Sequence, residues 1–159
     1  MAIQNKFNQF VEDLNKKKID VSADSLFLLL TNTSPNAADI RVNVPSGGAV
    51  CIVEATSNAN EIAAGNGYTK KGGAVTVTTA SQTSGTFTLA ANQVVFTASG
   101  GALPTFRYAV LFDDTGGTAT ARPVIAWWDY GAGGVTLNDG ETFTVKFNNA
   151  NPGTIYTLA

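Results

Sequence analysis

The chain has 159 residues, a formal net charge of −2, no histidine and a single cysteine. A chain of this length fits one domain, which can bury roughly 70% of its unfolded surface on folding. Without histidine or a second cysteine, the commonest general base, the commonest zinc ligand and any intrachain disulfide are excluded.

Charged residues make up 14% of the chain, so the surface must be largely neutral and polar. The only run of three basic residues is Lys16–Lys18, which offers no broad positive surface for nucleic acid. The longest aliphatic run, Leu26–Leu30, is far shorter than the roughly 20 residues that cross a bilayer. We expect no nucleic-acid or membrane partner, and a soluble protein that stays in the compartment of its synthesis.

The N-terminal segment predicts an amphipathic helix. Phe7, Phe10, Val11 and Leu14 recur at the spacing of one helix face, over about three turns. A helix this short is not stable alone in water, so its apolar face must dock on the rest of the chain or on a neighbouring subunit.

From residue 19 onward the pattern changes to period two or to short apolar runs. We therefore divide the chain into an N-terminal helix or arm, residues 1–18, and a single β-sandwich domain, residues 19–159. Residues 25–31 are apolar on both faces, which predicts a central strand covered from both sides. The alternation Val75–Thr78 predicts a strand with one apolar and one hydroxyl face, and Cys51 lies in an apolar run and is expected to be a small buried hydrophobe.

Residues 106–114 and 123–131 predict two strands of a hairpin with a long loop. One face of the first strand carries Phe106, Tyr108, Val110 and Phe112. The more uniformly apolar face of the second carries Val124, Ala126, Trp128 and Tyr130. If that face is interior, Trp127 points outward, because neighbouring strand residues face opposite ways.

Three interpretations of Trp127 stay open. It is a contact residue of a protein interface, or the N-terminal helix covers it within the chain, or it is a stacking platform for a sugar. The candidate interface residues are Phe7, Phe10, Val11, Leu14 and Trp127. On the first interpretation, Phe10→Asp leaves the β domain folded and abolishes binding.

In the last segment, Asp139 and Gly140 form a strong signal for a tight hairpin turn. Phe143, Val145 and Phe147 are expected to point inward, and residues 154–159 to form a final strand. Short strands with turns every 8 to 12 residues or so predict a mainly β fold, an antiparallel β-sandwich of jelly-roll-like type with one short N-terminal amphipathic helix.

Acidic pairs are the only candidates for catalysis or metal binding. Asp113 with Asp114, and Asp139 with Glu141, could act as acid and base or bind calcium. Each pair lies at a predicted turn, where Asp is favoured because it caps the backbone. Residues 65–73 carry glycines and lysines but lack a phosphate-loop pattern and are expected to form a flexible surface loop. We expect no catalytic residue, no cofactor and no metal.

The order of these motifs resembles the small β-rich structural proteins of tailed-bacteriophage virions. The resemblance covers nearly the whole chain and is most specific over residues 106–158. It is carried by the amphipathic helix and by the strings "SLFLLL", "GNGYTKKGG", "FRYAVLFDDTGG", "PVIAWWDYG", "VTLNDGETFTVKF" and "GTIYTL".

This resemblance implies a non-enzymatic virion component, assembled in the bacterial cytoplasm. The role it implies first is a capsid decoration or cement protein that binds the major capsid protein, acts as a homo-oligomer and stabilises the capsid. Two alternatives remain: a tail or neck protein of the head–tail connection, and a host-glycan-binding module on the particle surface that uses Trp127 or Tyr130.

Overall fold

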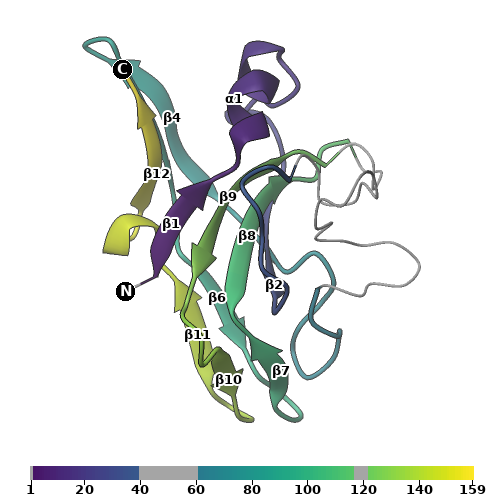
Figure 1. The fold of residues 1–159 in the computed structure, drawn as a ribbon. Helices are drawn as coiled ribbons and strands as arrows, with labels where there is room; N and C mark the ends of the chain where they lie inside the picture. Colours follow the sequence, from purple (N-terminus) through teal and green to yellow (C-terminus); the bar gives the residue numbers. More distant parts are fainter. Residues whose placement is uncertain (1, 40–60, 117–121) are drawn as a thin grey trace.

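The computed structural model describes residues 2–39, 61–116 and 122–159. Within these ranges the chain is mainly β, with one α-helix near the N-terminus (Figure 1). Cys51 and the apolar run around it lie outside the described residues. The elements are β1 (Ile3–Lys6), α1 (Asn8–Asn15), β2 (Leu26–Thr31), β3 (Gly73–Ala74), β4 (Val77–Thr83), β5 (Thr86–Ala91), β6 (Val94–Thr97), β7 (Leu103–Phe106), β8 (Tyr108–Asp113), β9 (Val124–Asp129), β10 (Val135–Leu137), β11 (Thr142–Val145), the 3₁₀ helix η2 (Phe147–Asn149) and β12 (Gly153–Leu158).

The strands pair antiparallel throughout the described ranges. One sheet has the order β1-β9-β8-β2-β3 and another the order β12-β5-β4, while β10 pairs with β7 and β11 with β6. In Figure 1, β12 and β4 lie on one side of the molecule, and β1, β9, β8 and β2 follow in that order away from them. The predicted mainly β, antiparallel fold with one helix is confirmed, and its jelly-roll connectivity stays a prediction.

Side chains are buried on both faces of the five-stranded sheet. The main core includes Phe10, Leu28, Leu30, Leu89, Phe96, Phe106, Leu111, Trp128, Phe147 and Ile155. The outer cluster, on the opposite face, consists of Phe7, Leu29, Tyr108, Val110, Phe112, Val124 and Trp127. Successive leucines of β2 belong alternately to the main core and to the outer cluster, which confirms β2 as a strand covered from both sides. Each such leucine, once buried, contributes about 1.5–3 kcal/mol.

The N-terminal segment is part of the sheet structure. Residues 3–6 form β1, the edge strand that pairs with β9, and α1 then starts at Asn8, later than the sequence pattern indicates. Phe7 precedes the helix in an extended conformation, so its side chain joins the outer cluster instead of the helix face. Residues 2–18 therefore contribute side chains to both the main core and the outer cluster.

β9 bulges at Ile125, where its register against β8 shifts by one residue. Ile125 and Ala126 both reach the main core as a result. Val124 turns to the outer cluster and joins Trp127 there. The prediction that Trp128 faces the interior is confirmed, but the prediction that Val124 shares its face is wrong.

The predicted single strand 106–114 is two strands in different sheets. β7 ends at Phe106 and pairs with β10, whereas β8 begins at Tyr108 and pairs with β2 and β9. The chain changes sheets at Arg107, whose carbonyl accepts a hydrogen bond from the Tyr130 N–H at 3.0 Å. Phe106 lies in the main core and Tyr108 in the outer cluster, so the predicted common face is wrong at this point.

The turn at Asp139 and Gly140 is present, but the hairpin is not. The Glu141 N–H donates to the Asn138 carbonyl at 3.0 Å, and Gly140 has a φ of +83°, as a tight turn requires. The flanking strands β10 and β11 have separate partners, β7 and β6. The final strand is confirmed as β12, and the inward positions of Val145 and Phe147 are confirmed by their burial.

Candidate functional site

Three of the five candidate interface residues are covered by their own chain. Phe7, Phe10 and Trp127 are 0%, 2% and 9% exposed. Val11 is 44% exposed, and Leu14 is half-buried against the main core. The predicted helix face is therefore divided, with Phe10 inside the fold, Leu14 half-buried and Val11 exposed.

Trp127 is covered within the chain. Its ring contacts Phe7, with the ring centroids 4.4 Å apart. The neighbouring Asp129 accepts two hydrogen bonds from Arg107, at 2.8 and 2.7 Å. The hydrogen bond from Arg107 holds the pKa of the Asp129 carboxyl below its usual value. Of the three interpretations of Trp127, intrachain cover is the one found, although Phe7 and not the helix supplies the ring that meets it.

An apolar groove lies between α1, residues 17–21 and the end of β12. Its volume is about 850 Å³. The apolar side chains that line it are Phe10, Val11, Leu14, Ile19, Val21, Phe87, Tyr156 and Leu158. We call this the α1–β12 groove. It brings together three of the candidate residues, Phe10, Val11 and Leu14, with residues of β12 that helical spacing does not indicate.

Aromatic rings form part of the lining of the α1–β12 groove. The Tyr156 ring meets Phe10 edge-on at a centroid distance of 5.2 Å and lies 6.2 Å from Phe87. Leu158, at the end of β12, is 49% exposed. The groove therefore combines a fixed aromatic wall with the exposed side chains of Val11 and Leu158, which a partner could cover.

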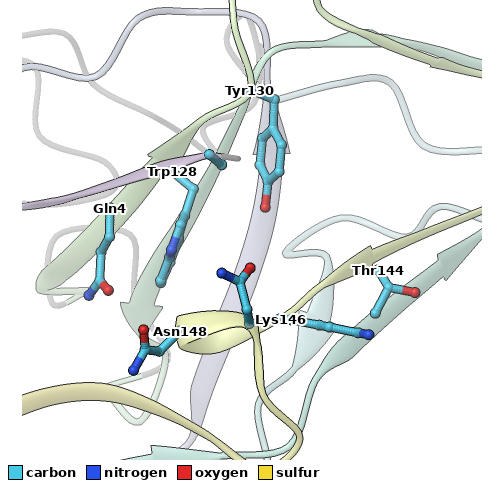
Figure 2. A pocket seen from close by; sticks show the side chains of 8 residues that line it. Gln4, Trp128, Tyr130, Thr144, Lys146 and Asn148 are labelled. Atoms are coloured by element: carbon cyan, nitrogen blue, oxygen red, sulfur yellow. The ribbon is translucent and has the colours of Figure 1, made fainter.

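A second concavity, of about 310 Å³, lies where β1, β9, β11 and η2 meet (Figure 2). Its lining residues are Ala2, Gln4, Trp128, Tyr130, Thr144, Lys146, Asn148 and Asn149. We call it the Trp128 pocket. It shares no lining residue with the α1–β12 groove.

The acidic pairs are engaged in turns and ion pairs. Asp113 accepts a hydrogen bond from the Thr115 N–H at 2.7 Å, and Asp139 one from the Gly100 N–H at 2.8 Å. Asp114 is paired with Lys71 at 3.0 Å and with Arg122. The described ranges contain no group of three or more potential metal ligands.

The segment 65–73 is anchored to the sheet. The Tyr68 hydroxyl donates to Glu61 Oε1 at 2.6 Å and accepts from the Leu30 N–H at 3.0 Å. Tyr68 is only 3% exposed, and burial raises the pKa of its hydroxyl far above the usual value. The expectation of a freely flexible surface loop is wrong at Tyr68, because its ring is part of the main core.

Comparison with known proteins gives no relative. No protein-family model, curated protein or solved structure matches the chain. Among residues 2–39, 61–116 and 122–159, no helix combines the length and apolar character needed to span a membrane.

Proposed function

We propose that the protein is a non-enzymatic structural component of tailed-bacteriophage virions, specifically a decoration or cement protein that binds and stabilises the major capsid lattice. The observation that carries the proposal is the α1–β12 groove, an apolar concavity with Val11 and Leu158 exposed. The resemblance of the ordered motifs to virion proteins supports the same class. The protein would assemble in the bacterial cytoplasm, reside in the virion and act as a homo-oligomer.

The chemistry of the surface favours apolar docking. Only 14% of the residues are charged, so long-range attraction contributes little to association. Apolar area removed from water contributes about 25 cal/mol per Å². Stable interfaces bury roughly 1,200–2,000 Å² in total, so the groove would form the centre of a contact whose rim is the neutral polar surface around it.

A protein that binds the assembled capsid lattice more tightly than it binds free capsid subunits acts as a cement. A ligand that binds only the assembled state stabilises it by mass action, whatever the detailed contacts. A protein that spans two capsid subunits must also be pulled from at least one before they separate. No covalent chemistry is needed, and the fold would act as a rigid clamp.

Two exposed valines provide a matched test. Val11 lines the groove and is 44% exposed, whereas Val95 lies on β6, outside the groove, and is 49% exposed. We expect Val11→Asp to weaken binding to capsids that lack the protein by tenfold or more, roughly the cost of a carboxylate in an interface centre. Val95→Asp is expected to bind as the unchanged protein does.

The assay is co-sedimentation of each purified variant with such capsids, with a circular dichroism melt of each to show that it is folded. Equal loss of binding in the two variants, or full binding by Val11→Asp, would contradict the assignment of the groove as the docking surface.

A further inference from the structure

The lining of the Trp128 pocket is more polar than that of the α1–β12 groove. It is lined by amide, hydroxyl and ammonium groups from Gln4, Asn148, Thr144 and Lys146, beside the aromatic rings of Trp128 and Tyr130. Its volume of about 310 Å³ is near the lower end of the roughly 300–1,000 Å³ typical of small-ligand sites. A pocket of this size suits one sugar ring better than an extended chain.

Each aromatic ring of the pocket, Trp128 and Tyr130, packs against a phenylalanine ring. The Trp128 ring packs on Phe147 at a centroid distance of 5.4 Å, and the Tyr130 ring meets Phe143 edge-on at 4.8 Å. Trp128 is only 3% exposed, so it forms a wall and not a broad stacking face. Tyr130 is half-buried and offers the ring surface on which the C–H face of a sugar could rest.

Several polar groups of the pocket are free to meet a ligand. Within the described residues, the Tyr130 hydroxyl and the side chains of Thr144 and Asn148 make no hydrogen bond. The Gln4 amide nitrogen donates to the Ile155 carbonyl at 2.7 Å, which fixes the side chain and leaves its oxygen as an acceptor. In Figure 2 the Tyr130 hydroxyl and the Trp128 indole point into the same space, with Gln4 and Asn148 at its edge.

The loop that carries Asn148 is held in an uncommon backbone conformation. Asn148 and Asn149 have φ of +47° and +55°, in the left-handed region that asparagine tolerates better than most residues. Phe147, which is fully buried against Trp128, anchors this loop. Such conformations persist only when the surrounding structure fixes them, and they concentrate at binding sites.

Charge distinguishes between classes of ligand. Lys146 is the one ionisable cation in the lining, and the lining contains no acidic residue. A phosphate site needs more positive charge or several converging backbone N–H groups. Amides and hydroxyls, by contrast, both donate and accept, as sugar hydroxyls do.

We propose that the Trp128 pocket binds a neutral saccharide, with Tyr130 Oη and the Asn148 and Gln4 amides bonding its hydroxyls and the Tyr130 ring contacting its C–H face. This goes beyond capsid binding. Because the pocket and the groove share no lining residue, failure of one assignment leaves the other standing.

The two tryptophans make the test direct. The chain contains only Trp127 and Trp128, and only Trp128 lines the pocket. In ¹H–¹⁵N spectra of the full chain, titrated with the methyl glycosides of glucose, galactose, mannose and N-acetylglucosamine, we expect at least one sugar to shift the Trp128 indole signal. The Trp127 signal is the internal reference and stays in place.

Variants assign the hydrogen bonds. Tyr130→Phe and Asn148→Ala are each expected to weaken that binding by about threefold to tenfold, the worth of one hydrogen bond. Asn8→Ala, at an exposed asparagine on α1 outside both concavities, is expected to leave it unchanged. The proposal is overturned by no Trp128 shift with any of the four glycosides at tens of millimolar, by equal shifts of both indoles, or by binding that the two pocket variants do not change. A Trp128 shift with inorganic phosphate alone would also overturn it.

Discussion

Gly153, at the start of β12, has no room for a side chain. A Cβ there would lie 1.7 Å from the Phe147 carbonyl oxygen and 2.6 Å from its carbon. Gly153→Ala must therefore push η2 away from β12, and we expect it to lower the free energy of unfolding by about 1–3 kcal/mol. Gly133→Ala is the control, because a Cβ at Gly133 meets nothing within 4 Å. Urea denaturation curves measure both, and equal stability of the two variants would contradict the packing at η2.

Tyr156 and Tyr68 both have buried hydroxyls, but these hydroxyls differ in what they meet. In the described ranges the Tyr156 hydroxyl is buried without a hydrogen-bond partner, and burial raises its pKa to about 12. The Tyr68 hydroxyl bonds both Glu61 and the Leu30 N–H. Since an unpartnered buried polar group costs free energy, we expect Tyr156→Phe to raise the stability by about 1 kcal/mol and Tyr68→Phe to lower it by about 1–3 kcal/mol.

Thermal or urea melts of these two variants give the comparison. Loss of stability in Tyr156→Phe similar to that in Tyr68→Phe would mean that the Tyr156 hydroxyl has a partner after all.

At the scale of elements, Phe10 is the buried apolar side chain of α1. Phe10 is 2% exposed and belongs to the main core, whereas Val11, the next residue, is 44% exposed. The earlier expectation that Phe10→Asp leaves the domain folded is therefore replaced, because it would bury a carboxylate among apolar groups. We now expect Phe10→Ala to cost about 3–5 kcal/mol and Val11→Ala less than about 0.5 kcal/mol.

Denaturation followed by far-ultraviolet circular dichroism and by tryptophan fluorescence measures both effects. A Phe10→Ala variant as stable as Val11→Ala would mean that α1 is not packed on the main core.

Some elements could be predicted from local pattern, and others could not. β2 was predictable because both of its faces are apolar, and β12 because residues 154–157 are β-branched or aromatic. The break at Arg107 could not be predicted, because the residues on either side keep the alternation of a single strand while the strands with which they pair change. The bulge at Ile125 was equally hidden, since a bulge changes the register without changing the composition.

Part of the candidate site could also be predicted from local sequence pattern. Helical spacing selected Phe10, Val11 and Leu14, which do line the α1–β12 groove. It could not select Tyr156 or Leu158, because only the folded chain brings β12 beside α1. Nor could it show that Phe7 would pair with Trp127, since this depends on the helix starting at Asn8.

At the scale of the whole molecule, two concavities among the described residues differ in character. The α1–β12 groove is mainly apolar and suits a protein partner, and the Trp128 pocket is polar and suits a small neutral ligand. A virion protein with both would bind the capsid through one and a surface glycan through the other. Capsid binding determines where the protein is found and in what number.

The most direct test is quantitative mass spectrometry of purified phage particles from the source organism. A decoration protein occupies equivalent positions over the whole lattice, so we expect a copy number comparable to that of the major capsid protein, or a simple fraction of it. A handful of copies per particle would contradict a decoration role and indicate the tail or neck. Absence of the chain from the particles would contradict the virion assignment itself.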